Sequence, residues 1–216
     1  MKRIFIFSVA LFFAFVSKAQ VQVGIFAGPH ISSAFYSSEG YNQPTDPKFG
    51  FHAGMLCKIP FDNHLFFSPA ISYRLMGYKV TLNRPSYPPD LLAINNNTSF
   101  HEIDIDPLLQ YDLSKKSSHF FVRGGPSFEF ILTGKENYDL ATGDHVEQAM
   151  KFSTTNYYGR YGVAAVVQFG YEKSGDFSVY GNAIMYLMSM NNEDTGPTIR
   201  NWLTGITFCK YIKTLH

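Results

Sequence analysis

The sequence is poor in charged residues, in cysteine and in tryptophan. Charged residues make up 16% of the 216 positions, against about 25% in an ordinary soluble domain. The 18 Lys and Arg residues nearly balance the 17 Asp and Glu residues, so no basic surface for nucleic acid is predicted. Two cysteines are too few for a disulfide scaffold. An aromatic content of 17% excludes a disordered chain.

Residues 1–19 have the composition of a secretory signal peptide. A basic start, an apolar run and a small-residue cleavage point follow one another: Lys2 and Arg3, then residues 4–16, then Ser17-Lys18-Ala19. The apolar run of about 13 residues is shorter than the roughly 20 that a membrane-spanning helix needs. We therefore expect cleavage near Ala19 and one remaining domain, residues 20–216. Removing the three basic residues leaves 15 basic against 17 acidic ones, so no nucleic-acid partner is expected.

The rest of the chain contains little helical periodicity and no apolar run long enough for a membrane-spanning helix. Instead, apolar residues alternate with polar or small ones. Phe49, Phe51 and Ala53 share one face of a stretch whose other face carries Gly50 and His52. A period of two is that of an extended strand with two unlike faces. Eight strands are predicted, at residues 20–29, 49–60, 64–80, 100–113, 119–132, 157–172, 176–190 and 198–212.

The connections between these strands alternate in length. Three are tight turns, at 61–63, 114–118 and 173–175, whereas residues 30–48, 81–99 and 133–156 form long connections and 191–197 a moderate one. Short and long connections therefore lie at opposite ends of the molecule. Outer-membrane barrels have this pattern, with short periplasmic turns and longer outer loops.

Alternation alone fits a soluble sheet as well as a membrane barrel. The strands are longer than the usual 5–6 residues of soluble sheets, and their polar faces carry glycine and charge. We therefore predict an all-β, eight-stranded, antiparallel, up-and-down transmembrane barrel in the outer membrane of a Gram-negative bacterium, with lipid as its surroundings. A soluble periplasmic ligand-binding barrel is the alternative. Interfacial aromatic belts are expected at Phe49, Tyr73, Tyr78, Tyr111, Phe120, Tyr157, Tyr171 and Tyr211.

Several short motifs occur in order along the predicted strands. They are Val23-Gly24-Ile25-Phe26-Ala27-Gly28, Gly50-Phe51-His52-Ala53-Gly54, Ser68-Pro69-Ala70-Ile71-Ser72-Tyr73, Ile103-Asp104-Ile105-Asp106-Pro107-Leu108-Leu109-Gln110-Tyr111 and Arg123-Gly124-Gly125-Pro126. In these the chain resembles the PorT-type outer-membrane β-barrel proteins, small porin-like barrels of certain Gram-negative bacteria. The resemblance implies a barrel in the outer membrane, and it suggests an accessory role in envelope assembly or secretion.

Ionisable residues on the polar faces form the first candidate site. They are His52, Arg74, Glu102, Asp104, Asp106, Arg123, Glu129 and Arg160. Inside a barrel, opposite charges are expected to pair, because an unpaired charge is costly there. The lumen of an eight-stranded barrel is just filled by its own side chains. We therefore predict a salt-bridged plug with a structural role, and the alternative is a passive porin for small solutes.

Catalytic and metal sites have weaker support. Ser99, His101 and Glu102 are close in sequence, but neighbouring strand residues point to opposite faces. His30 and His145 fall in predicted loops. No Gly-x-Ser-x-Gly or His-Glu-x-x-His motif occurs. We expect no enzyme, with an outer-membrane hydrolase or acyltransferase acting on lipid as the alternative, and no cofactor or metal.

The most specific functional hypothesis is that the long outer connections bind a partner or ligand. They carry Tyr36, Tyr41, Tyr87 and Tyr138, and Tyr suits adaptable contacts with proteins or glycans. Envelope or secretion proteins are the expected partners there.

The cysteines are expected to stay unpaired. Cys57 and Cys209 fall on strands that flank a common neighbour, about 10 Å apart, beyond the roughly 7 Å that a disulfide allows.

Overall fold

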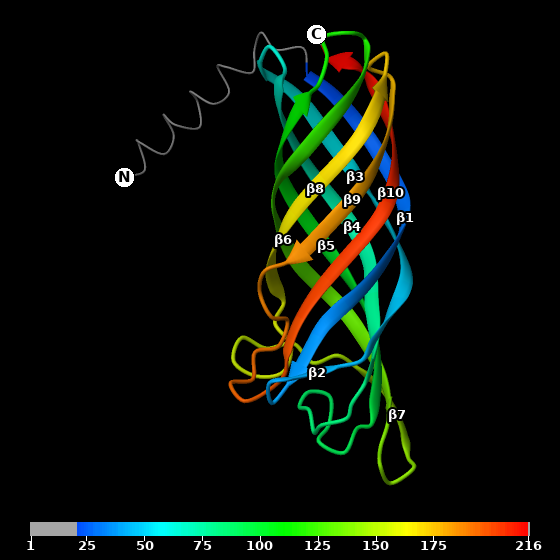
Figure 1. The fold of residues 1–216 in the computed structure, drawn as a ribbon, viewed down its shortest axis with the longest axis vertical. Coiled ribbons are helices and arrows are strands. Elements are labelled where there is room, and N and C mark those ends of the chain that lie inside the picture. Colours follow the sequence, from blue (N-terminus) through cyan, green and yellow to red (C-terminus); the bar gives the residue numbers. More distant parts are fainter. Residues whose placement is uncertain (1–20, 216) are drawn as a thin grey trace, which may run out of the picture.

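The computed structural model describes residues 21–215, with side chains described as far as Ile212. The predicted signal peptide, residues 1–19, lies outside the described residues. Eight antiparallel strands close into a barrel (Figure 1). They are β1 (Val21–Ser38), β3 (Thr45–Asp62), β4 (Leu65–Thr81), β5 (Asn95–Asp112), β6 (Ser118–Asp139), β8 (Tyr161–Lys173), β9 (Phe177–Tyr186) and β10 (Thr198–Leu215).

Pairing between the first and last strands completes the ring. β1 and β10 pair from Val21 opposite Leu215 to Ser37 opposite Thr198, so the barrel has no open edge in the part that a membrane would cover. Two short strands lie outside the ring: β2 (Tyr41–Gln43) pairs with β1, and β7 (His145–Ala149) pairs with β6. The predicted eight-stranded barrel is confirmed.

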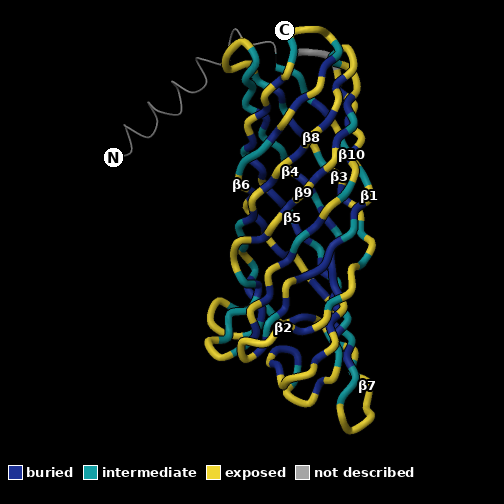
Figure 2. The backbone as a smooth tube through the Cα atoms, in the orientation of Figure 1, coloured by how far each residue is buried: buried dark blue, intermediate teal, exposed yellow. Residues whose placement is uncertain are grey.

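Buried and exposed residues alternate along the strands (Figure 2). On β5, Glu102 and Asp104 are buried, whereas Ile105 exposes 56% of its surface on the outer wall. This is the reverse of a soluble sheet and follows from having hydrocarbon as the outer solvent. Among the described residues, no helix is long and apolar enough to cross a membrane.

The outer wall carries a ring of apolar side chains, here called the apolar band. Its members include Phe51, Met55, Ile71, Ile105, Leu109, Phe128, Phe130, Val167, Phe169, Met185, Ile206 and Phe208, all of them exposed. On β4 and β6, the outward residues turn polar toward the long loops, at Lys79 and Lys135. The strands therefore continue beyond the band at the end with the long loops, here called the loop end. The other end, with the short turns and both ends of the barrel chain, is called the turn end (Figure 1).

This continuation corrects the predicted loop at 30–48. β1 extends to Ser38 and β3 begins at Thr45, and the two pair as far as Ser32 opposite Lys48. Beyond the band the outward residues of the strands are no longer apolar. The alternation of apolar and polar residues in the sequence therefore ends before the strands do. The seventh predicted strand, 176–190, is shorter in the structure, where β9 ends at Tyr186.

Two residues assigned to the aromatic belts point inward instead. Tyr78 and Tyr211 are both buried. Tyr78 alternates with the outward Lys79, and Tyr211 with the outward Lys210, so their parity places them inside. An aromatic residue near a strand end does not have to belong to an interfacial belt, because the barrel interior also needs large side chains to fill it.

The two cysteines are free. Cys57 is opposite Val23 on one side of β1, and Cys209 is opposite Phe26 on the other side. The expected arrangement about a common neighbour is confirmed.

Candidate functional site

The centre of the lumen holds an arginine among carboxylates. The period of two on β5 turns Glu102, Asp104 and Asp106 to the same side, and β4 places Arg74 directly opposite Glu102. The Arg74 guanidinium lies 2.9 Å from Asp104 Oδ1, 3.2 Å from Asp106 Oδ2 and 3.8 Å from Glu102 Oε1. All four side chains are buried. The guanidinium therefore links three positions along one strand.

Glu129 adds a fourth carboxylate from the next strand. It lies on β6 opposite Asp104 and is buried. Within the described part of the chain, neither of its carboxyl oxygens has a hydrogen-bond partner. Gly162 makes room for it, since a Cβ there would come within 2.5 Å of Glu129 Oε2. Tyr186 donates a hydrogen bond to Glu102. Among the described residues, the lumen centre thus holds one guanidinium beside four carboxyl groups, and ionising all four would be costly in a low-dielectric interior.

Arg123 is buried in the lumen closer to the turn end, and no carboxylate of the described residues forms an ion pair with it. Its Nη1 donates to Gln168 Oε1 at 3.0 Å, and Nε and Nη2 donate to Gln110 Oε1 at 3.1 and 2.5 Å. The guanidinium also lies over the Tyr180 ring, 5.2 Å from its centre. Side-chain amides and an aromatic face therefore satisfy this cation in place of the expected ion pair.

His52 belongs to a histidine pair that the sequence analysis missed. His52 Nδ1 and His30 Nδ1 are 3.1 Å apart, and His52 Nε2 is 2.7 Å from Thr207 Oγ1. The sequence predicts a loop at His30, whereas in the structure this residue is buried on β1. Extending the alternation through Gly28 to His30 would have found it.

Arg160 does not join the lumen cluster, which corrects its predicted place. It lies one residue before β8, whose pairing with β6 ends at Phe130 opposite Tyr161. Its Nη1 donates to the carbonyl oxygens of Ile131 and Leu132 at 3.1 and 3.0 Å. The guanidinium covers the Phe152 ring, 4.8 Å from its centre. The predicted strand begins at residue 157, whereas β8 begins at Tyr161. Arg160 is therefore outside the strand, and the alternation does not fix the direction of its side chain.

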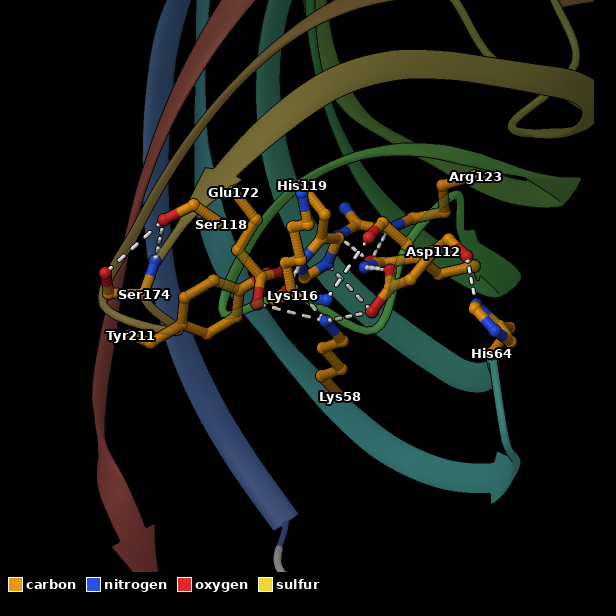
Figure 3. Close-up of polar contacts among 12 residues, drawn as sticks. Lys58, His64, Asp112, Lys116, Ser118, His119, Arg123, Glu172, Ser174 and Tyr211 are labelled. Carbon is orange, nitrogen blue, oxygen red and sulfur yellow. Dashed lines mark hydrogen bonds and ion pairs between the residues drawn. The ribbon is translucent and has the colours of Figure 1, made fainter.

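A second charged cluster lies at the turn end of the lumen (Figure 3). Lys58 Nζ is 2.9 Å from both Asp112 Oδ2 and Glu172 Oε2, and His119 Nε2 is 2.9 Å from the same Asp112 oxygen. Tyr211 donates to Glu172 Oε2 at 3.2 Å. The polar faces of the predicted strands include Lys58, Asp112 and Glu172. The sequence did not predict that these three side chains meet in space.

A cavity of about 500 Å³ opens above this cluster at the turn end. Lys58, Asp112, His119 and Glu172 form part of its lining, and the turn after β5 adds Lys115 and Lys116. Deeper in the lumen, a pocket of only about 20 Å³ lies between Arg74 and Arg123. The lumen therefore narrows from an open vestibule to a space about the size of one water molecule.

The loop end of the lumen is closed by an apolar core. Tyr36, Tyr78, Phe100, Tyr158 and Ile199 are buried in one cluster there. This corrects the predicted binding role of Tyr36 and Tyr138, both of which are buried. Beyond the band the barrel has water outside it, so its interior fills with apolar side chains like an ordinary core. Tyr41 and Tyr87 remain exposed.

A small polar cavity remains among the loops, about 170 Å³ in volume. Its lining includes Tyr87, Glu136, Lys151 and Tyr157. Glu136 lies beyond the apolar band, and burial raises the pKa of its carboxyl. Hydrogen bonds that it accepts from Tyr158 at 2.8 Å and from Gln148 at 2.9 Å oppose that shift. A hydrogen bond with Tyr157, followed by burial, raises the pKa of Tyr87 to about 12.

The candidate catalytic residues do not come together. Ser99 Oγ accepts a hydrogen bond from Lys48 Nζ at 2.6 Å, and His101 Nδ1 lies 2.5 Å from the Tyr73 hydroxyl. Both lie on the outer wall, whereas Glu102 is buried in the lumen. Within residues 21–212, no group of three or more His, Cys, Asp or Glu side chains could hold a metal ion. Asp104 and Asp106 instead contact Arg74.

A closed antiparallel barrel with an apolar exterior and a charged interior defines an integral membrane β-barrel protein. The chain belongs to the outer membrane protein beta-barrel domain family, whose model matches residues 13–194. Its location is accordingly the outer membrane. No curated protein matches the chain.

Three solved outer-membrane structures are similar to this chain. Ail, the attachment invasion locus protein of Yersinia pestis, solved with the heparin analogue sucrose octasulfate, has 11% identity and a TM-score of 0.43, with coverage of 88% of this chain and 99% of that one. Neisserial surface protein A has 12% identity, a TM-score of 0.43, and coverage of 88% and 96%. OprG from Pseudomonas aeruginosa has 11% identity, a TM-score of 0.45, and coverage of 90% and 97%.

Proposed function

We propose that this protein is a plugged outer-membrane barrel that acts in the cell envelope as a structural or partner-binding protein and does not conduct solutes. The observation that carries the proposal is the closure of the lumen at successive levels. At its centre, beside Arg74, a pocket of only about 20 Å³ remains, and the apolar core around Phe100 and Tyr158 occupies its loop end. The turn end of the lumen opens into a cavity of about 500 Å³.

Binding is assigned to the loop end. The extended strands and the β6–β7 hairpin carry the loops away from the apolar band (Figure 1). Tyr41 is 58% exposed and Tyr87 36% exposed, and both are available to a partner. Tyr exposes a large rigid surface with a polar tip, which suits contacts with proteins or glycans.

The PorT-type resemblance extends the proposal to an accessory role in envelope assembly or secretion. Export by a signal peptide, with cleavage near Ala19, belongs to the same proposal. Enzymatic activity is not part of it, because Ser99 and His101 face outward while Glu102 faces the lumen.

Conductance tests the plug directly. Purified barrel, shown to be folded by a heat-modifiable gel shift, would be inserted into planar bilayers and into liposomes for swelling assays with small sugars. We expect no stable conductance and no swelling above protein-free controls. A stable, large conductance would overturn the plug and favour the passive small-solute porin.

Partner binding requires a second test. Cross-linking in intact cells would compare wild type with the double variant Tyr41→Ala/Tyr87→Ala. The matched control is Lys115→Ala/Lys116→Ala, which changes exposed residues at the turn end. We expect a specific cross-linked product that the tyrosine variant loses and the control retains. Equal products in all three proteins would contradict binding at the loop end.

A further inference from the structure

Three lysines converge on the outer wall just beyond the apolar band. Lys79 on β4 and Lys135 on β6 are exposed and alternate with the buried residues Tyr78 and Glu136. β5 runs between the two strands: Lys79 lies opposite its Asn97, and Lys135 lies opposite its Ser99. The two lysines therefore flank β5 at almost the same height along the barrel.

Lys48 brings the third ammonium group to the same place. The register of β3 on β4 shifts between Pro47 and Phe51, and the Lys48 side chain crosses Gly77, where a Cβ would lie 3.2 Å from Lys48 Cδ. Its Nζ then donates to Asn97 Oδ1 at 2.7 Å, Thr98 O at 2.9 Å and Ser99 Oγ at 2.6 Å. The absent side chain at Gly77 thus lets Lys48 place its charge over β5, between Lys79 and Lys135.

The positive charge of this group is not neutralised by the protein. Among the described residues, no carboxylate lies within 4.0 Å of the ammonium group of Lys48, Lys79 or Lys135. Asp46 is opposite Lys79 in the register but makes no ion pair with it, and Glu136 points into the lumen. Lys79 and Lys135 also make no side-chain hydrogen bond within the described part of the chain, so their donors are free.

Below the lysines the outer wall turns from polar to apolar. The next outward positions toward the turn end are Gly77 on β4, His101 on β5 and Thr133 on β6. The apolar side chains of Leu75, Ile103 and Leu132 follow them. Apolar side chains on this wall face hydrocarbon, and the first cations beyond them lie at the level of the lipid headgroups. Because the long loops mark the outer side of such barrels, these headgroups are those of the outer leaflet.

We infer that Lys48, Lys79 and Lys135 bind the phosphate groups of an outer-leaflet glycolipid that carries two phosphates. Lys79 and Lys135 are on strands two apart, roughly 10 Å at the usual strand spacing, which is wider than one phosphate group. Lys48 is held in place between them by its three acceptors and supplies fixed charge. The acyl chains of the same lipid would lie on the apolar wall below, around Leu75 and Ile103.

Native mass spectrometry of the purified full-length barrel in a neutral detergent tests the inference. The probes are diphosphorylated lipid A, the same glycolipid with its phosphates removed, and phosphatidylglycerol. The variant Lys79→Gln/Lys135→Gln removes two charges whose side chains make no other polar contact, and Lys79→Arg/Lys135→Arg keeps both charges. The control is Lys115→Gln/Lys116→Gln at the turn end, and a heat-modifiable gel shift shows that each protein is folded.

We expect the Gln variant to bind diphosphorylated lipid A about tenfold or more weakly than wild type, whereas the Arg variant and the turn-end control bind like wild type. Binding by wild type should also weaken as salt is added. Equal binding by wild type and the Gln variant would overturn the site. An equal loss in the turn-end control, or equal binding of the dephosphorylated lipid, would also overturn it. If phosphatidylglycerol bound as tightly as lipid A, the inference that the ligand carries two phosphates would be overturned.

Discussion

Lys58 and Glu172 are 114 residues apart in the chain, and their side chains meet at 2.9 Å inside the turn end of the barrel. Lys58 comes from β3 and Glu172 from β8, on different sides of the ring. The contact therefore spans the lumen, and it exists only when the barrel has closed. Among the described residues Lys58 is the one cation paired with Glu172, so removing Lys58 would leave a buried carboxylate uncompensated. Removing Glu172 would leave Lys58 paired with Asp112 alone.

A double-mutant cycle measures this contact. Lys58→Met and Glu172→Gln are each expected to lower the free energy of unfolding, and the double variant should lose less than the sum of the two. We expect a coupling energy of about 1–3 kcal/mol, measured by urea unfolding in lipid vesicles. Additive effects would show that the two charges do not stabilise each other in the folded barrel.

Glu129 and Asp104 face each other across β5 and β6 but differ in their partners. Glu129→Gln replaces a buried carboxyl group whose oxygens have no hydrogen-bond partner among the described residues, so the free energy of unfolding should stay unchanged or rise by up to about 1 kcal/mol. Asp104→Asn replaces the carboxylate that contacts Arg74 at 2.9 Å with a neutral amide, and it should lower the free energy of unfolding by about 1–3 kcal/mol. The same unfolding assay compares both variants. A larger loss for Glu129→Gln than for Asp104→Asn would contradict the described ion pairs.

Gly28 tests the closure of the barrel at the β1–β10 seam. A Cβ at this position would lie 1.9 Å from the carbonyl oxygen of Ile206, which is backbone and has little room to move. Gly28→Ala should therefore lower the free energy of unfolding by about 2 kcal/mol or more. Gly181→Ala is the matched control, because its Cβ would find no atom closer than 4.0 Å. A change in both variants by the same amount would contradict the close approach at the seam.

Tyr87 gives a prediction for pH dependence at the loop end. Its pKa of about 12 lies above the ordinary value near 10. A raised pKa means that the stability contributed by the protonated phenol is complete below pH 10 or so and is lost as the pH rises through about 12. Tyr157→Phe removes the hydrogen-bonding partner and should move the Tyr87 titration toward lower pH. Difference ultraviolet titration of each protein against its Tyr87→Phe counterpart isolates this group, and an unshifted titration in Tyr157→Phe would contradict the contact.

The fold was predictable because one pattern repeats along the chain. Alternation on residues such as Ile103, Asp104 and Ile105 assigns a face to every side chain, and the alternating connection lengths order the strands. The position of Arg74 among the β5 carboxylates follows from the same parity. The predicted positions of Arg160, Tyr36 and Tyr138 were wrong. Parity gives a side-chain direction only within a recognised strand, and the strand ends lie outside the apolar band, where the alternating pattern is lost.

By itself, the sequence determined which side chains face lipid and which face the lumen, since hydrocarbon outside the barrel requires apolar residues at every second position. Only the tertiary structure decided which lumen residues meet. The stagger between strands sets the height of each residue, so it joins Lys58 to Glu172, leaves Glu129 without a hydrogen-bond partner and gathers Lys48, Lys79 and Lys135 on one wall. That stagger is a property of the closed ring, and the sequence of a single strand does not determine it.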